Sequence, residues 1–321
     1  MADEEGMIGD SLTLELVCPR DHTRLEAVSD QEMRCAECGR SYPVHNGIVS
    51  VLDAPNAFYE GAYLNQTRFL PKSERIWHAW PLWLLVNGYP WMVRRHVPEG
   101  ARVVELGCAS GVAYFGKRYR MVGCDLSMVS LKGLPYQQRV QCDAGDCIPL
   151  PDGAVDAVVS SYFWEHIPPQ TKSRILAECR RVLKPGGKII FLYDVETDNP
   201  LIRHYKSVDP ALYKRQFIDG DGHYGYERPR DNQSTFEAGG FRIIEHRGLE
   251  KTWFQSPAAY VKLRAYEDRL ERLFALGSAM GRSPWFYLYT GFMRLLDTAV
   301  CPVLPEDWAR IELVVCERAA D

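Results

Sequence analysis

The chain has 321 residues, of which 46% are hydrophobic and 25% charged, proportions typical of a globular protein with one large and one small domain. Its net charge of −4 argues against a general nucleic-acid binder, which would present a basic face. Ten cysteines are too sparse for a disulfide scaffold, and neither a signal peptide nor a long apolar run is visible, so we expect a cytoplasmic protein with free thiols and no transmembrane helix.

Residues 1–10 are acidic and are expected to form a flexible tail, and residues 11–54 contain a small cysteine-bearing unit. Cys35 and Cys38 form a CxxC knuckle, and Cys18 opens a second turn. Structural zinc takes four Cys or His ligands, and a unit of about 45 residues is marginal without a metal. The unit therefore predicts one structural Zn²⁺, with a ribbon that has lost its metal as the alternative.

Two residues compete for the fourth zinc position. Asp21 stands where a second CxxC knuckle would place its cysteine, and His22 follows it. Structural zinc sites favour imidazole over a lone carboxylate, so we predict His22, with Asp21 as the alternative. The predicted ligands are Cys18, His22, Cys35 and Cys38. With the trailing Tyr42-Pro43-Val44 and Gly47-Ile48, the unit resembles a short zinc-ribbon family that serves as a partner or N-terminal fusion of methyltransferases.

Residues 55–100 are aromatic and contain four closely spaced tryptophans, Trp77, Trp80, Trp83 and Trp91. Packing between the ribbon and the large domain is the plain explanation for most of them. The segment 58–63 is predicted to form a lid over the active site. The aromatic side chains of residues 55–100 would also allow peripheral contact with a membrane or with a lipophilic acceptor.

Strand and helix patterns alternate through residues 101–250, which predicts an α/β fold with a doubly wound, mostly parallel sheet. A helix is expected at 170–183, ended by Pro185-Gly186-Gly187. A sixth strand is expected at 241–246 and a seventh at 309–317. The five preceding strands are expected at 102–108, 120–125, 139–143, 154–161 and 188–195.

The turn after the first of these strands carries the strongest signal. Glu105 lies near the end of the strand, and Gly107 and Gly111 follow. Glycines at this spacing let the chain turn sharply and expose backbone N–H groups to a ligand. Asp125 ends the second strand at a distance that suits a ribose-binding carboxylate, and Asp143 ends the third.

These features resemble the ordered motifs of class I S-adenosylmethionine-dependent methyltransferases, which in this chain are 105–111, 123–127, 143–144, 164–167 and 183–187. The resemblance covers roughly residues 100–250 and the final strand. It implies a Rossmann-like sheet of seven strands, the last antiparallel, and S-adenosyl-L-methionine as cofactor. It also implies cofactor contacts from Glu105, Gly107, Cys108, Gly111, Asp125, Leu126, Asp143 and Ala144.

Within that resemblance, Asp125 would accept hydrogen bonds from both ribose hydroxyls, a bidentate task for a carboxylate. Asp143 would accept from the adenine amino group, and Glu105 would contact the amino group of the methionine part. Turn acids that cap helices are the alternative for both aspartates. Ala109 replaces the commoner middle glycine of the turn.

Residues 251–307 separate the last two predicted strands, which in this fold usually form a near-hairpin. So long a connection in a compact domain must fold or function. Apolar spacing predicts helices at 257–276 and 284–300. We therefore expect a helical insertion that partly covers the acceptor side, followed by the last core strand and the C-terminus at 308–321.

Two histidines are candidates for acceptor chemistry. His166 follows the fourth strand, and His223 lies in a glycine-punctuated polar loop. A histidine side chain ordinarily has a pKa close to neutral pH, so it is suited to take a proton from a hydroxyl. His223 is the first choice of general base, because Glu165 and His166 have a structural alternative, in which they order their loop.

The sequence therefore predicts a methyltransferase acting on a small or lipid-linked acceptor at a hydroxyl, by positioning plus general-base help. No Asn/Asp-Pro-Pro-aromatic tetrad follows the fourth strand, which argues against methylation of exocyclic base amines. An RNA methyltransferase with a zinc-ribbon recognition domain is the main alternative, and a non-catalytic partner protein is a third. Neither the methylated atom nor the oligomeric state follows from the sequence.

Overall fold

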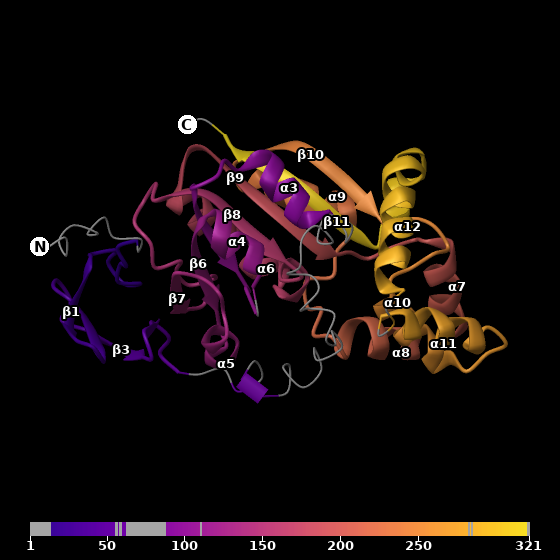
Figure 1. Ribbon diagram of the computed structural model, residues 1–321, viewed down its shortest axis with the longest axis horizontal. Coiled ribbons are helices and arrows are strands. Elements are labelled where there is room, and N and C mark those ends of the chain that lie inside the picture. The colour runs from indigo at the N-terminus through magenta and orange to yellow at the C-terminus, as the bar shows by residue number, and fades with distance from the viewer. Residues whose placement is uncertain are drawn as a thin grey trace, which may run out of the picture.

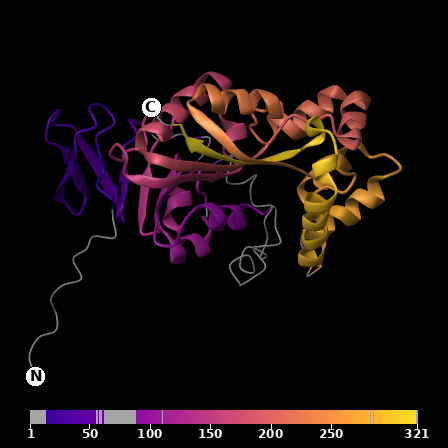
Figure 2. The same ribbon diagram turned by 90° about the horizontal axis from the view of Figure 1, so that it is seen from above.

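The computed structural model describes residues 14–54, 57, 60–61, 88–109, 111–281, 283 and 285–319. The expected tail at 1–10 lies outside this range, as does the expected lid apart from Glu60 and Gly61. Trp77, Trp80 and Trp83 also lie outside it. The centre of the molecule is a sheet of eleven strands, in the order β1-β2-β3-β4-β7-β6-β5-β8-β9-β11-β10 (Figures 1 and 2).

Seven of these strands form the core: β7 (Gln138–Gln141), β6 (Arg120–Asp125), β5 (Arg102–Leu106), β8 (Val155–Ser161), β9 (Leu183–Asp194), β11 (Ile311–Arg318) and β10 (Phe241–Leu249). The first five run parallel, and β11 is antiparallel to both of its neighbours. The fold class expected from the sequence, an α/β doubly wound sheet with an antiparallel last strand, is confirmed.

Helices cover both faces of this sheet, which is why its central strands are continuous apolar runs. The core on one face includes residues of α3 (Tyr89–His96), α4 (Ala113–Arg118) and α5 (Met128–Lys132). The core on the other face includes residues of α6 (Pro169–Val182) and α9 (Pro229–Ala238). Helix α6 buries Ile175, Leu176, Cys179 and Val182, which share one side of the helix.

The N-terminal unit extends this sheet, so the sheet has more strands than the seven expected. It consists of β1 (Leu25–Ser29), β2 (Glu32–Cys35), β3 (Ser41–His45) and β4 (Ile48–Ser50). Strand β4 pairs in parallel with β7, with Val49 opposite Val140. The amide of Val17 also donates to the carbonyl of Pro149 at 3.1 Å. An unpaired β7 would leave a row of backbone groups without partners, and β4 bonds them.

A helical cluster lies at the other end of the molecule from β1–β4 (Figures 1 and 2). It joins α7 (Pro200–Val208) and α8 (Pro210–Tyr213) to α10 (Pro257–Leu263), α11 (Glu271–Met280) and α12 (Phe286–Ala299). Tyr205, Phe217, Leu263 and Phe274 are among the residues of its core. The described residues contain no helix long and apolar enough to cross a membrane.

The single helix expected at 257–276 is wrong. A short 3-10 turn at Arg264–Tyr266 follows α10, and Glu267 then adopts a left-handed backbone with φ +49°. A left-handed residue cannot continue a right-handed helix, so α11 starts afresh at Glu271. The insertion as a whole lies at the carboxyl ends of the parallel strands (Figure 1), the end on which the acceptor side was expected.

Candidate cofactor and acceptor site

The turn after β5 contains three residues with a left-handed backbone, Gly107 (φ +59°), Ala109 (φ +41°) and Gly111 (φ +66°). A Cβ on Gly107 would lie 2.5 Å from Phe163, and one on Gly111 would lie 2.5 Å from Leu134. Both positions therefore require glycine. Ala109 holds the same backbone region at a steric cost, and such strain is concentrated at ligand sites.

Asp125, at the end of β6, is bonded to this turn. Its carboxylate accepts hydrogen bonds from the amide of Ala109 at 2.9 Å and the amide of Ser127 at 2.8 Å. Burial raises the pKa of Asp125. Each carboxylate oxygen accepts about two hydrogen bonds, so both oxygens keep a lone pair for a further donor. The backbone thus orients the carboxylate and leaves it able to bind a diol.

Glu60 is a neighbour of this carboxylate that the sequence analysis missed. It accepts hydrogen bonds from the amide of Met128 at 2.7 Å and from the side chain of Gln141 at 3.1 Å. Its charge contributes to the raised pKa of Asp125. No sequence signal indicates this contact, because Glu60 lies far from β6 along the chain.

Glu105 is turned into the protein. It is 2% exposed and accepts hydrogen bonds from the hydroxyls of Tyr89, at 3.2 Å, and Tyr136. Burial raises its pKa to about 7. The Tyr136 hydroxyl also accepts from the amide of Val112 at 2.8 Å, so Glu105 supports the glycine turn through Tyr136. Its expected contact with a cofactor amino group stays a prediction.

The remaining expected cofactor residues follow three adjacent strands, β5, β6 and β7. Asp143 accepts a hydrogen bond from the amide of Gly145 at 2.8 Å and is half-buried, as is Leu126. Cys108 and Ala144 are buried. The sheet therefore gathers the expected cofactor residues at one edge, at the carboxyl ends of parallel strands where α/β folds bind ligands.

His166 and His223 come from different loops but lie against each other. Their ring centroids are 5.1 Å apart, and the side chains are 9% and 5% exposed. The Nδ1 of His166 donates to the carbonyl of Gly222 at 3.1 Å, because a carbonyl can only accept. Burial lowers the pKa of both, that of His223 to about 4, so both imidazoles are neutral at pH 7.

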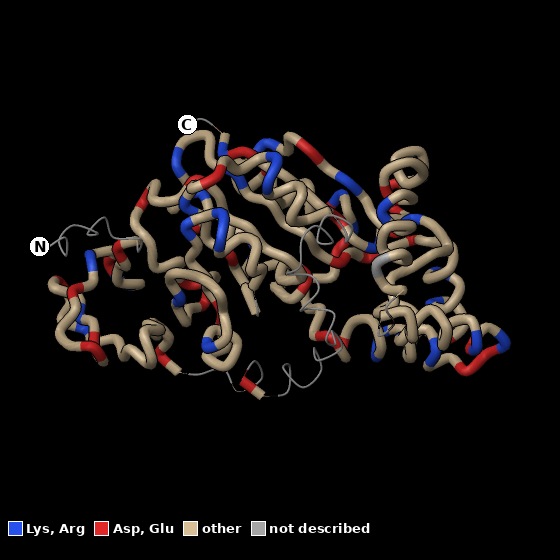
Figure 3. Tube along the Cα trace, in the orientation of Figure 1, with Lys and Arg blue, Asp and Glu red and all other residues tan. Residues whose placement is uncertain are grey.

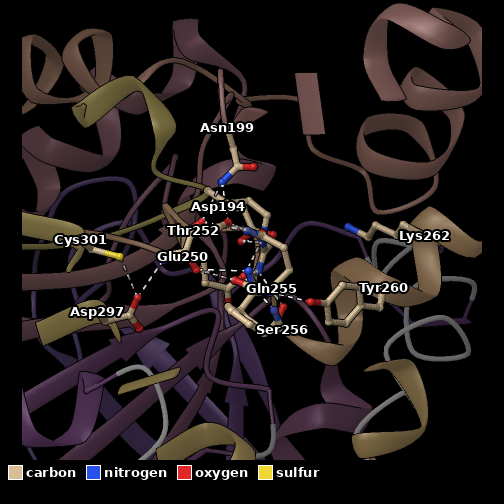
Figure 4. Close-up of polar contacts among 12 residues, drawn as sticks. Asp194, Asn199, Glu250, Thr252, Gln255, Ser256, Tyr260, Lys262, Asp297 and Cys301 are labelled. Atoms are coloured by element: carbon tan, nitrogen blue, oxygen red, sulfur yellow. Dashed lines mark hydrogen bonds and ion pairs between the residues drawn. The ribbon is translucent and has the colours of Figure 1, made fainter. Parts of the chain in front are cut away.

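A buried network of ion pairs lies at the carboxyl end of the parallel strand β9. The sequence analysis missed this network. Arg310, just before β11, donates to Glu250 at 2.6 and 2.8 Å and to Asp194 at 3.2 Å. Asp194 ends β9, and Glu250 follows β10. Figure 4 shows both carboxylates among the polar groups of the loop that leads into the insertion, including Ser256, to which Arg310 also donates. The network anchors the insertion to three strand ends.

The N-terminal cysteines converge as expected, but with a different fourth residue. Cys18, Asp21, Cys35 and Cys38 place one potential ligand atom each within 4.8 Å of one another. The Thr23 amide lowers the pKa of Asp21 to about 2, so it is a carboxylate at neutral pH. His22 lies outside this group, near Cys147 and Glu178, with φ +58°. Three thiols and a carboxylate fit the donor set of a tetrahedral zinc site.

Comparison with protein families identifies two segments. Residues 104–191 match the model of the methyltransferase domain, and residues 10–47 match the Trm112p-like protein family. The resemblance to class I methyltransferases with an N-terminal ribbon is thereby confirmed.

Three curated relatives have quinone- or sterol-related names. A ubiquinone/menaquinone biosynthesis C-methyltransferase (UbiE) of Cupriavidus necator is 34% identical, over 38% of this chain and 51% of its own. A demethylmenaquinone methyltransferase of Clavibacter sepedonicus is 30% identical, over 47% and 61%. A sterol 4-C-methyltransferase of Caenorhabditis elegans is 25% identical, over 48% and 48%. The chain thus spans about half the length of the curated relatives it matches.

Two solved structures show a weaker likeness. A complex containing the Haloferax volcanii Trm112 methyltransferase activator has a TM-score of 0.48 and 16% identity, and covers 83% of this chain and all of its own. The geranyl diphosphate C-methyltransferase of Streptomyces coelicolor has a TM-score of 0.47 and 13% identity, over 72% and 76%.

Proposed function

We propose that this chain, a methyltransferase domain joined to a Trm112p-like domain, transfers a methyl group from S-adenosylmethionine to a small or lipid-linked acceptor. The observation that carries the proposal is the oriented carboxylate of Asp125 beside the left-handed turn at Gly107–Gly111. S-adenosylmethionine, when bound, supplies a methyl group on a sulfonium that is already an excellent leaving group. The protein then has to bind the cofactor and the acceptor, orient them toward each other, and exclude water.

The residues divide this work between two sides of the site. Asp125 would accept from the ribose hydroxyls and Asp143 from the adenine amino group. The turn at Gly107–Gly111 lets the backbone approach the methionine part. His166 and His223 lie in the loops after β8 and before α9, and they would contact the acceptor. We infer a hydroxyl acceptor, because a neutral imidazole can accept the proton that a hydroxyl must lose.

The acceptor class is inferred from the surroundings of the two histidines. Both rings are buried, and His223 stacks on Tyr226 with centroids 5.3 Å apart. Buried aromatic rings suit contact with a small, partly apolar molecule better than contact with a polynucleotide. The names of the quinone and sterol methyltransferases point the same way.

The main alternative, RNA methylation, is favoured only by the Trm112p-like domain. Figure 3 shows Lys and Arg interspersed with Asp and Glu along much of the trace, whereas an RNA-binding surface gathers basic residues. The deciding experiment supplies radiolabelled S-adenosylmethionine with a panel of phenols, hydroquinones and sterols, and separately with transfer and ribosomal RNA. Label transferred only to RNA would overturn the acceptor class.

We expect Asp125→Ala to weaken binding of S-adenosylmethionine by about 1.5–3 kcal/mol, the size of lost charged hydrogen bonds. Isothermal titration calorimetry on both proteins measures it. Asp152→Ala is the matched control, since Asp152 is a surface carboxylate paired with Arg181 at 2.9 Å, away from the β5–β7 edge. Unchanged affinity in Asp125→Ala would remove Asp125 from the ribose role.

We propose that Cys18, Cys35, Cys38 and Asp21 hold one structural zinc ion in the N-terminal domain. Metal analysis of protein purified without added zinc should give about one equivalent, because a closed four-ligand site retains its ion. We expect Asp21→Ala to lose the metal and His22→Ala to keep it. The reverse result would return the fourth position to His22, and a folded, metal-free wild type would defeat the zinc assignment.

A further inference from the structure

Glu165, His166 and His223 form a group whose possible ligand atoms all lie within 4.8 Å of one another. Glu165 is 1% exposed, and both histidines are buried. Within the described part of the chain, Glu165 Oε2 and His223 Nδ1 are buried without a hydrogen-bond partner. Buried polar atoms are nearly always paired, so two unpaired atoms in one group indicate that the group binds a further ligand.

Lys172 is a cation beside Glu165, but its donors are engaged elsewhere. Its ammonium donates to the carbonyl of Gly225 at 2.9 Å, to Asn232 at 2.9 Å and to Glu227 at 2.5 Å. An ammonium has three N–H donors, so these contacts use all of them. Burial raises the pKa of Glu165 well above its usual range, and the charge of Lys172 opposes that rise only in part. Among the described residues, no cation is bonded to the unpaired oxygen of Glu165.

One ring nitrogen of each histidine faces an oxygen atom of the protein. The Nδ1–H of His166 donates to the carbonyl of Gly222, which leaves the lone pair on Nε2. The Nε2 of His223 faces a carboxylate oxygen of Asp221 at 3.8 Å, beyond hydrogen-bond distance, and its Nδ1 is buried without a hydrogen-bond partner. In metal sites the second ring nitrogen faces a carbonyl or a carboxylate in this way, which orients the ring.

Another group of similar composition, His246, Glu306 and Glu312, provides a contrast. There His246 bonds Glu312 directly, Gln233 donates to Glu306, and the Tyr193 hydroxyl donates to Glu312 at 2.9 Å. That group is closed by its own hydrogen bonds. The Glu165 group differs because Glu165 Oε2 and His223 Nδ1 have no hydrogen-bond partner among the described residues.

We propose that Glu165, His166 and His223 bind one divalent transition-metal ion, such as Mn²⁺, Fe²⁺ or Zn²⁺. Two imidazoles and a carboxylate suit these ions, and three protein ligands leave positions open for an acceptor oxygen. Ligand atoms on one ion lie roughly 3–3.5 Å apart, so a pair at the 4.8 Å limit of this group would approach by about 1.3–1.8 Å on binding.

The role of the ion, unlike the site itself, rests on the proposed function. With the ion bound, an acceptor hydroxyl that coordinates it would have a lowered pKa and would release its proton to solvent water. The acceptor oxygen then forms its bond to the methyl carbon while the carbon–sulfur bond breaks, with the electron pair left on sulfur. His166 and His223 would act in this step as metal ligands, in place of the general-base role proposed above.

The test titrates the full-length protein with Mn²⁺ and follows free Mn²⁺ by electron paramagnetic resonance. Mn²⁺ favours oxygen and nitrogen ligands over thiolates, so it reports this group and not the N-terminal cysteines. We expect one site in the wild type, weakened at least about tenfold in Glu165→Gln and in His223→Ala. His204→Ala, which removes an exposed histidine of α7, is the matched control and should bind as the wild type does.

Spin-echo modulation of Mn²⁺ bound to the wild type provides a readout that does not depend on the variants folding. We expect nitrogen couplings from histidine. Absence of saturable Mn²⁺ binding, absence of nitrogen coupling, or undiminished binding in both folded variants would each overturn the site. Binding of S-adenosylmethionine is measured separately by calorimetry, so loss of the metal site would leave the proposed function standing, and loss of cofactor binding would not affect the metal result.

Discussion

Replacing Arg310 by methionine is expected to destabilise the protein by about 3–5 kcal/mol, because it leaves uncompensated carboxylates in the interior. Arg310 is 4% exposed and is the partner of both Glu250 and Asp194. Methionine keeps much of the volume but none of the donors. Urea unfolding at neutral pH, followed by circular dichroism, measures the loss.

Two further variants distinguish the stability lost through uncompensated buried charge from the stability lost through poorer packing. Arg310→Met combined with Glu250→Gln should recover part of the stability, because the second change removes one stranded charge. Arg174→Met is the matched surface control, since Arg174 and its partner Asp146 are 61% and 70% exposed, and it should change stability by less than about 0.5 kcal/mol. A loss below about 1 kcal/mol in Arg310→Met would show that the network does not hold the strand ends together.

Replacing His223 by alanine is expected to lower turnover about a hundredfold or more while leaving the affinity for S-adenosylmethionine unchanged. The expectation follows from position: His223 lies against His166, on loops separate from the turn and the aspartate expected to hold the cofactor. Initial rates with a confirmed acceptor, together with cofactor calorimetry, measure the two effects separately.

His204→Ala again provides the control and should keep full turnover. A His223→Ala protein that loses cofactor affinity in proportion to its activity would indicate a general structural role for His223. Full activity in both His223→Ala and His166→Ala would exclude both histidines from the acceptor chemistry.

The core of the fold was accessible from the sequence because its signals are local. Apolar runs marked the parallel strands, and the acidic residues near their ends, Glu105 and Asp125, marked the carboxyl edge. The pairing of β4 with β7 was not accessible, because nothing within a short window shows that two distant strands will be neighbours. The break at Glu267 was missed because apolar spacing continues across it, whereas the left-handed residue that ends the first helix leaves no mark in that spacing.

The site was predicted in part for the same reason. Each histidine was identified singly, from its position after a strand or in a polar loop. Their contact, and the convergence of Glu165 with them, depends on how two loops pack and is visible only in three dimensions. Arg310 carried no signal at all, because an arginine before a strand is ordinary until its burial is known.

The pairing of β4 with β7 also means that the strand covering β7 belongs to the same chain as β7. If a separate protein donated this strand, the strand would cover β7 only while that protein was present and bound. Here the chain that connects the two domains sets the effective concentration of β4 at the edge of β7. The ratio of the domains is therefore one to one in every molecule. No second polypeptide has to be synthesised, found or retained to cover this edge, and a foreign strand that approaches it meets backbone groups that are already bonded.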